Sequence, residues 1–150
     1  MSAREMLVID TTGRASCPPE ALAEIEGLPV RFEPARAVEE DDVIEAARGA
    51  TAILVTAAYV TRRVMKALQP DLRAVVRYGV GLDRIDLEAA RELGVDVRNV
   101  REFCTNEVAD QTLALVMALS RRLVQHVLAT REGRWGGVGA GPLVRLSGKR

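Results

Sequence analysis

Residues 76–86, with the sequence VRYGVGLDRID, are the part of the chain whose residue types and spacing most suggest a binding site. The turn Gly79-Val80-Gly81 follows an apolar run and precedes a segment of helical character. Glycines permit unusual backbone dihedrals, and they also leave backbone N–H groups open to a small anion such as a carboxylate. The stretch therefore has two compatible interpretations: a plain tight turn, and a turn whose amides bind a carboxylate.

The same turn does not fit a phosphate-binding loop. A dinucleotide-binding loop needs three glycines spaced Gly-x-Gly-x-x-Gly, and a P-loop ends in Gly-Lys-Ser/Thr. In this chain Gly81 is followed by Leu82-Asp83-Arg84, so the third glycine is missing, and a carboxylate at Asp83 would repel a phosphate. We expect Asp83 to accept hydrogen bonds from turn amides and Asp86 to cap the next helix.

Strands and helices alternate around this turn. Short apolar runs indicate strands, and segments that begin near Pro, Asp or Thr and end at Gly or Pro indicate helices. The expected strands are 5–10, 29–33, 51–56, 72–78 and 95–100, and the expected helices are 18–27, 39–49, 61–68 and 86–94. This order predicts an α/β fold with a flavodoxin-like doubly wound parallel sheet, covered on both faces. Such sheets bind ligands at the carboxyl ends of their strands, where the glycine turn lies.

The pattern changes after the fifth strand. From Thr105 to about Thr130 apolar residues recur at intervals of three or four, which predicts one long, mostly buried helix. It exceeds the average length of about 11–12 residues, so we expect it to connect two bodies. A glycine-rich, irregular arm follows. The expected domains are therefore a lobe over 1–100 and a crossover helix with an arm over 101–150.

Composition narrows the function classes. Lys plus Arg and Asp plus Glu both total 21, so the net charge of zero gives no general attraction to nucleic acid or to anionic membranes. The longest strongly apolar stretch, Thr112–Leu119, is too short to span a bilayer, and the N-terminus lacks the apolar core of a signal peptide. Cys17 and Cys104 have no metal-type spacing, so we expect free thiols, no metal site and a cytoplasmic location.

Two other kinds of site are disfavoured by the residues present. A phosphoacceptor receiver domain shares the five-fold alternation, but it needs adjacent acids after the first strand and an aspartate ending the third. The first expected strand ends in Asp10-Thr11-Thr12, and the third ends at Thr56. His126 is the only histidine, and its place on the long helical segment predicts a surface or interface side chain.

The stretch from Val76 to Trp135 resembles the D-isomer-specific 2-hydroxyacid dehydrogenases, which include D-3-phosphoglycerate dehydrogenase, hydroxypyruvate reductase and the C-terminal-binding-protein corepressors. The resemblance is carried, in this order, by GVGLDRID, LEAARELGVDVRNV, CTNEVADQTLALVMALSRRL and REGRW. It implies that 1–100 is a substrate lobe and that 101–150 leads to a nucleotide-binding domain outside this sequence. It also implies hydride transfer between 2-keto acids and D-2-hydroxy acids, with NAD or NADP bound mostly by that domain.

The resemblance also implies roles for individual residues. The positions matched to substrate binding are Gly79, Val80, Gly81, Ala57 and Tyr59. Val80 and Val108 match positions beside the nicotinamide cofactor. No residue matches the family's catalytic arginine, glutamate or histidine, so no catalytic residue is assigned and the chain alone is expected to be inactive. A homodimer through the long helix and arm is implied as well.

Departures from the family pattern concern the subfamily rather than the family. Arg84 stands where asparagine is common, Gln111 where histidine is common, and Arg101 replaces a usual proline. A second hypothesis comes from a different function class: a non-catalytic dimerising or corepressor-like binding module that keeps the lobe and the long helix.

Overall fold

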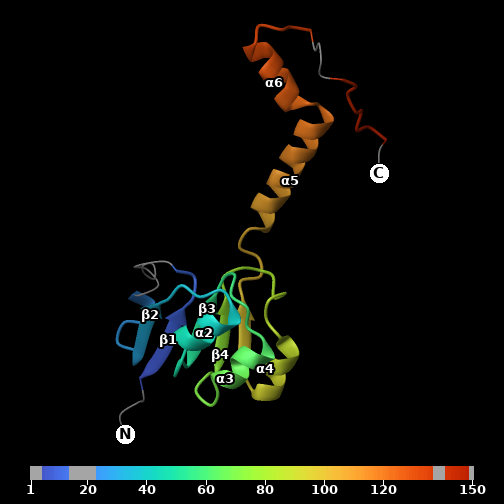
Figure 1. Cartoon of the computed structure of the whole chain (residues 1–150). Coiled ribbons are helices and arrows are strands. Elements are labelled where there is room, and N and C mark those ends of the chain that lie inside the picture. Colours follow the sequence, from blue (N-terminus) through green and yellow to red (C-terminus); the bar gives the residue numbers. More distant parts are fainter. Residues whose placement is uncertain (1–4, 14–22, 137–140, 149–150) are drawn as a thin grey trace. The chain divides into compact units, whose positions relative to one another are not determined.

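The structure is a computed structural model of the 150-residue chain and describes residues 5–13, 23–136 and 141–148 (Figure 1). It consists of two compact units, Met1–Phe103 and Cys104–Arg150. The first unit contains the sheet and its helices, and the second contains two helices and the arm. The boundary between the two units lies between residues 103 and 104. The boundary that the sequence predicts lies three residues earlier, between residues 100 and 101.

A five-stranded parallel sheet forms the first unit, with the strand order β2-β1-β3-β4-β5. The strands are β1 Met6–Asp10, β2 Val30–Pro34, β3 Ala52–Val55, β4 Ala74–Arg77 and β5 Asp96–Asn99. All five predicted strands are present, each within a few residues of its expected bounds. The strand order is the flavodoxin-like one, so the predicted fold class is confirmed.

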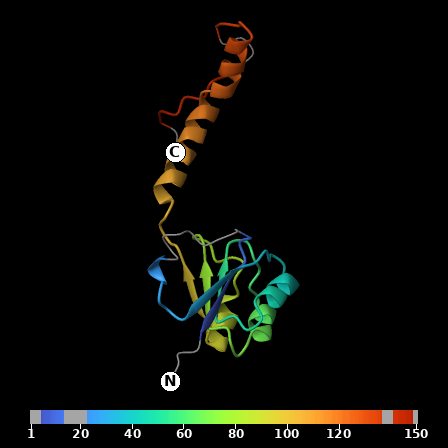
Figure 2. The same ribbon diagram turned by 90° about the vertical axis from the view of Figure 1, so that its left-hand side faces the viewer.

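Three helices form a layer beside the sheet, and the middle one packs against both others (Figure 2). They are α2 Glu40–Ala46, α3 Arg62–Ala67 and α4 Leu87–Leu93. Asp86 caps α4 as expected, because its side chain accepts a hydrogen bond from the Ala89 N–H at 2.8 Å. Gly94 ends α4 in the left-handed conformation, with φ of 69°. The helix expected over 18–27 lies largely outside the described residues.

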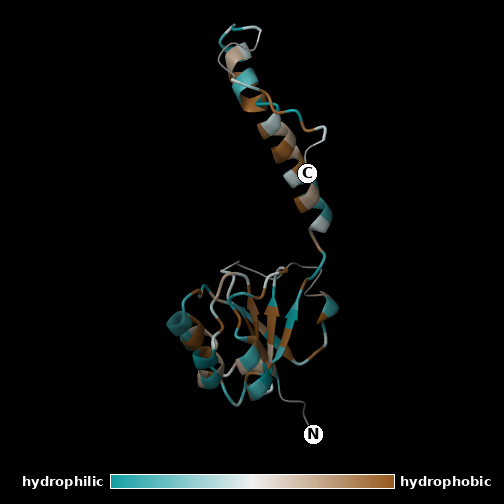
Figure 3. Ribbon diagram, turned by 90° about the vertical axis from the view of Figure 1, so that its right-hand side faces the viewer, coloured by the Kyte–Doolittle hydropathy of each residue, from teal (hydrophilic) through white to brown (hydrophobic). Residues whose placement is uncertain are grey.

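The core lies between the sheet and this helical layer. The strand register aligns Ile9, Ile53, Val75 and Val97 in one row across four strands. The first three of these side chains are buried, and Val97 packs against them half-buried. In Figure 3 the central strands are accordingly coloured hydrophobic. Each fully buried Val or Ile contributes about 1.5–3 kcal/mol, so this row stabilises the four strands that it crosses.

The second unit does not contain the single long helix that the sequence predicts. Two helices are present, α5 Thr105–Ser120 and α6 Leu123–Arg131, bent by 62° at a break between them. Arg122 causes the break, because its backbone is left-handed, with φ of 48° and ψ of 41°. Residues of the arm bind there: the Arg122 Nε donates to the Pro142 carbonyl at 2.9 Å, and the Val144 N–H donates to the Ser120 carbonyl at 3.1 Å.

The apolar stripe that predicts a mostly buried helix is exposed within this chain. Leu113 is 64% exposed and Leu119 is 77% exposed, and in the two helices only Ser120 and Ala129 are buried. Among the residues that the structure describes, no single helix is long and apolar enough to cross a membrane. The bent pair α5 and α6 meets the length and composition criteria only when the two helices are taken together.

Candidate functional site

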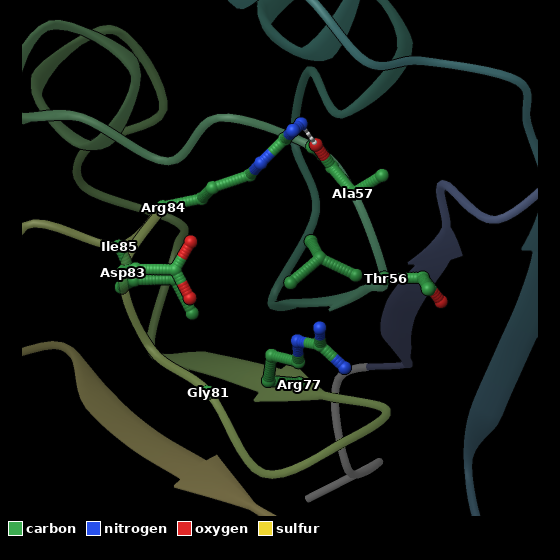
Figure 4. Close-up of a pocket in the computed structure, with 9 residues that line it drawn as sticks. Thr56, Ala57, Arg77, Gly81, Asp83, Arg84 and Ile85 are labelled. Atoms are coloured by element: carbon green, nitrogen blue, oxygen red, sulfur yellow. Dashed lines mark hydrogen bonds between the residues drawn. The ribbon is translucent and has the colours of Figure 1, made fainter. Parts of the chain in front are cut away.

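A pocket of about 240 Å³ opens at the carboxyl ends of β3 and β4 in the first unit (Figure 4). Two segments form it: the loop 56–60 that follows β3, and the turn 78–86 that follows β4. The lining residues are Val55, Thr56, Ala57, Ala58, Arg77, Gly81, Asp83, Arg84 and Ile85. This is the edge of a parallel α/β sheet at which ligands bind. The volume is below the roughly 300 Å³ at which pockets for drug-sized ligands begin, so the pocket suits a small molecule.

Backbone hydrogen bonds hold the two segments together at the base of the pocket. The Val60 N–H donates to the Arg84 carbonyl at 2.9 Å, and the Asp86 N–H donates to the Val60 carbonyl at 3.0 Å. Val60 and Ile85 form an isolated parallel bridge, and both side chains are buried. The Tyr59 N–H donates to the Val38 carbonyl at 2.9 Å, which ties the loop to the segment before α2. The site is therefore built on a fixed backbone.

The backbone N–H groups of the glycine turn differ in whether they are already hydrogen-bonded. The Gly79 N–H donates to the Arg77 carbonyl at 2.9 Å, so it is used within the turn. The carbonyls of Gly79 and Val80 accept hydrogen bonds from the Val100 N–H and the Asn99 Nδ2, at 3.2 and 2.7 Å. Within the described residues the N–H groups of Val80 and Gly81 have no hydrogen-bond partner. Successive backbone amides without a partner in a turn can bind an anion.

Three charged side chains line the pocket together with Gly81, and the sequence predicts none of them at the site. Arg77, the last residue of β4, extends its guanidinium toward the middle of the pocket, and Asp83 points inward from the other side (Figure 4). Arg84 closes one end by donating from Nη1 to the Ala57 carbonyl at 2.5 Å. The pocket thus carries two positive charges and one negative charge, which favours an anionic ligand.

The expectation that Asp83 accepts hydrogen bonds from turn amides is wrong. No such bond is found in the part of the chain that the structure describes. The Asp83 carboxylate instead lies against Gly81, where a Cβ would come within 2.8 Å of its Oδ1. Glycine at this position therefore leaves room for the Asp83 side chain as well as for a ligand.

Four of the residues expected at the site lie in the loop and the turn of the first unit, together with Tyr59, and Val108 belongs to the second unit. Gly81 and Ala57 line the pocket directly. Gly79 is buried in the turn, and Val80 beside it is 48% exposed. Tyr59 lies under Arg84, whose Cζ is 4.6 Å from the ring centroid. Val108 belongs to the first turn of α5 in the second unit, where its side chain is exposed.

Among the described residues, no histidine or cysteine lines the pocket. His126 lies on α6 in the second unit, and Cys104 is a free thiol at the start of α5. Across residues 5–13, 23–136 and 141–148 there is no group of three or more His, Cys, Asp or Glu side chains that could hold a metal ion. The donors at the pocket are backbone amides and arginine guanidiniums, which are groups that can bind a carboxylate.

Comparisons with known proteins show the family to which the chain belongs. The profile of the D-isomer specific 2-hydroxyacid dehydrogenase catalytic domain matches residues 7–137. A putative 2-hydroxyacid dehydrogenase of Staphylococcus aureus (strain bovine RF122) is 38% identical over 89 residues, which are 59% of this chain and 28% of that protein.

Solved structures of longer relatives superpose on the chain as well. A protein from Thermus thermophilus is 29% identical with a TM-score of 0.73, covering 92% of this chain and 45% of that one. A putative NAD-binding D-isomer specific 2-hydroxyacid dehydrogenase from Polaromonas is 26% identical with a TM-score of 0.69, covering 97% and 46%. The chain thus spans less than half the length of these relatives.

Proposed function

The chain belongs to the D-isomer-specific 2-hydroxyacid dehydrogenase family, and on that premise we propose that it forms the substrate-binding part of an enzyme that interconverts 2-keto acids and D-2-hydroxy acids. The chain would supply the site for the substrate carboxylate. A nicotinamide cofactor, NAD or NADP, would supply or accept the hydride when bound.

The free amides of Val80 and Gly81 are the observation that carries this proposal. A 2-keto acid presents a carboxylate next to its reacting carbonyl, so two adjacent N–H donors can hold the first group and orient the second. Arg77 adds a charge that attracts the acid to the pocket. The small volume of the pocket fits an acid with a short side chain.

The chain has side chains that suit one end of the cofactor. Val80 in the first unit and Val108 in the second are each exposed and apolar, as a residue in contact with a nicotinamide ring should be. The sequence has no Gly-x-Gly-x-x-Gly loop for the pyrophosphate, so the rest of the cofactor would be held by a domain outside these 150 residues.

We expect no turnover from residues 1–150 alone. Reduction of a keto group needs a proton donor within hydrogen-bond reach, and no histidine is found among the described residues that line the pocket. Asp83 is the one carboxylate in that lining, and it matches no catalytic position of the family. Oxidation of NADH by the purified chain with glyoxylate or hydroxypyruvate at ordinary enzyme rates would contradict this expectation.

Binding of a 2-keto acid to the free amides can be tested by titrating the ¹⁵N-labelled chain with pyruvate. The Val80 and Gly81 amide signals should shift the most, and the neutral pyruvamide should bind at least about tenfold more weakly, because one charged hydrogen bond is worth about 1.5–3 kcal/mol. In Gly81→Ala the affinity should fall, because the new Cβ crowds Asp83. Gly94→Ala, which strains the backbone at the end of α4 away from the pocket, is the control for a general loss of stability. Shifts spread evenly over the chain would overturn the proposal.

A second candidate function, a dimerising or binding module without catalysis, is favoured by one observation. The helices α5 and α6 expose many large apolar side chains, more than an isolated soluble surface normally carries in one place. The exposed set on these helices is Val108, Leu113, Leu115, Val116, Met117, Leu119, Leu123, Val124, Val127 and Leu128. The two candidates are compatible, since one protein can bind a substrate in its first unit and a partner through its second.

A further inference from the structure

Arg84 joins the two segments of the pocket through its side chain. Its Nη1 donates to the Ala57 carbonyl at 2.5 Å, although the two residues are 27 positions apart. Its guanidinium also stacks on Tyr59, with Cζ 4.6 Å from the ring centroid. Figure 4 shows the side chain reaching across one end of the pocket from the turn to the loop. Residues 57, 59 and 84 together are called the arginine latch below.

The arginine latch acts at Ala57, a part of the loop for which no backbone hydrogen bond is found among the described residues. The hydrogen bonds of Val60 with Arg84 and Asp86 fix the base of both segments, and the Tyr59 N–H is bound to Val38. Nearer the mouth, the Ala57 carbonyl has the Arg84 guanidinium as its partner. A planar guanidinium can bond a carbonyl and stack on a ring at once, a combination that few other side chains achieve. The position of Ala57 therefore depends on the Arg84 side chain.

We propose that Arg84 is a positioning residue that sets the width of the pocket and thereby selects 2-keto acids with short side chains. This inference rests on the proposed function, because it takes the glycine turn as the carboxylate site. With the carboxylate at Val80 and Gly81, the remainder of the acid must fit between the turn and the loop. Ala57 and Arg84 line that space, so a fixed latch limits its size.

The latch itself can be tested without any substrate. Amide hydrogen exchange of the ¹⁵N-labelled chain reports opening of the loop through the Tyr59 N–H. In Arg84→Met, which keeps an unbranched apolar stem but loses the guanidinium with its hydrogen bond and charge, this amide should exchange about threefold faster or more. The amide of Ala47, the residue that follows α2, should not change, and Arg31→Met, which removes an exposed arginine on β2, should leave the Tyr59 amide unaltered. Unchanged exchange at Tyr59 in Arg84→Met would overturn the latch.

The consequence for specificity is tested with a series of 2-keto acids: pyruvate, 2-oxobutyrate and 2-oxovalerate. Affinity for the wild-type chain, measured from amide shifts, should fall as the side chain lengthens. The ratio of affinities for pyruvate and 2-oxovalerate should shrink about three- to tenfold in Arg84→Met, since one methylene is commonly worth about tenfold or more. Arg31→Met should keep the wild-type ratio. A ratio unchanged in Arg84→Met would overturn the specificity role.

A double-mutant cycle separates the latch from a general loss of charge. If Arg84 acts through Tyr59, the effects of Arg84→Met and Tyr59→Leu on the affinity ratio should not add, because either change breaks the same contact. Additive effects would overturn the coupling. A wild-type chain that binds none of the acids would overturn the proposed function together with the specificity role, whereas the exchange result decides separately on the latch.

Discussion

The guanidinium of Arg77 occupies the space that a side chain at Gly79 would need. A Cβ built on Gly79 would overlap Nη1 of Arg77 and lie 2.8 Å from its Cζ. Gly79 also has φ of 144°, a conformation that residues with a Cβ rarely adopt. The glycine thus lets the turn bend sharply, and it also lets an arginine from the end of β4 reach the pocket beside the turn.

Gly79→Ala should consequently destabilise the chain and disturb the site. The strained backbone costs about 1–3 kcal/mol, and the new Cβ displaces Arg77. Urea unfolding measures the first effect, and titration with pyruvate measures the second. Gly94→Ala provides the comparison, because its φ is 69° but no atom lies within 4 Å of the added Cβ.

A variant that also carries Arg77→Ala separates the cost of the strained backbone from the cost of the overlap with Arg77. Removing the guanidinium relieves the overlap but not the strained dihedral, so Gly79→Ala should cost less stability in the Arg77→Ala background. An equal cost in both backgrounds would mean that Arg77 does not depend on the glycine.

Ion pairs between neighbouring helices should make stability depend on acid pH. Arg62 of α3 pairs with Glu92 of α4, and its hydrogen bond lowers the pKa of the Glu92 carboxyl below the ordinary value. Because the pKa is lower in the folded chain, the stabilisation is present above the unfolded value of about 4.3 and is lost as the pH falls through the folded value. Glu92→Gln should thus lose less stability than the wild type between about pH 6 and pH 3.

Urea unfolding at several pH values measures this effect, which is expected to be small because both side chains are exposed. Glu45→Gln in α2 is the control, since Glu45 forms no ion pair within the described residues. Raised salt should reduce the difference between Glu92→Gln and the wild type, because salt screens exposed charges. Identical acid profiles for Glu92→Gln and the wild type would show that the pair adds no stability.

The sheet could be predicted from the sequence because its signals are local. Short apolar runs mark each strand, and Asp86 and Gly94 mark the ends of α4 by their own capping chemistry. The break between α5 and α6 could not be predicted in this way. Residues 121 and 122 are both arginine, with no glycine or proline to interrupt the helical pattern, and the arm that binds there is distant in sequence.

The sequence predicts those parts of the site that act through the backbone. The glycine spacing indicated Gly81, and the resemblance supplied Ala57, and both line the pocket. The sequence does not point to Arg77, because a single charged residue at the end of a strand forms no periodic pattern. The contact of Arg84 with Ala57 and Tyr59 depends on how two distant loops meet, which only the folded chain shows.

We expect the exposed apolar residues of the second unit to drive self-association. Leu113 and Leu119 are the most exposed leucines of α5, and burial of each would contribute about 1.5–3 kcal/mol. Sedimentation equilibrium should show a dimer for the wild-type chain and a shift toward monomer for Leu113→Lys and Leu119→Lys. Gln125→Lys on α6 adds the same charge without removing apolar surface and should stay dimeric. A wild-type chain that is monomeric at high concentration would refute this prediction.

The difference in stability between Arg122→Gly and Arg122→Ala should show whether the helix is broken at this residue. In a helix interior glycine is less favourable than alanine by about 1 kcal/mol. At a left-handed residue the order reverses, because the Cβ of alanine costs about 1–2 kcal/mol in that conformation. Arg122→Gly should therefore be more stable than Arg122→Ala, with both lacking the hydrogen bond to Pro142.

The helical circular dichroism signal during thermal unfolding measures this difference. Gln125 lies inside α6, so Gln125→Ala should be more stable than Gln125→Gly, in the opposite order to position 122. If alanine is preferred at both positions, α5 and α6 form one continuous helix in solution, as the apolar spacing of the sequence predicts. If glycine is preferred at position 122 alone, the break between α5 and α6 is present in solution as well.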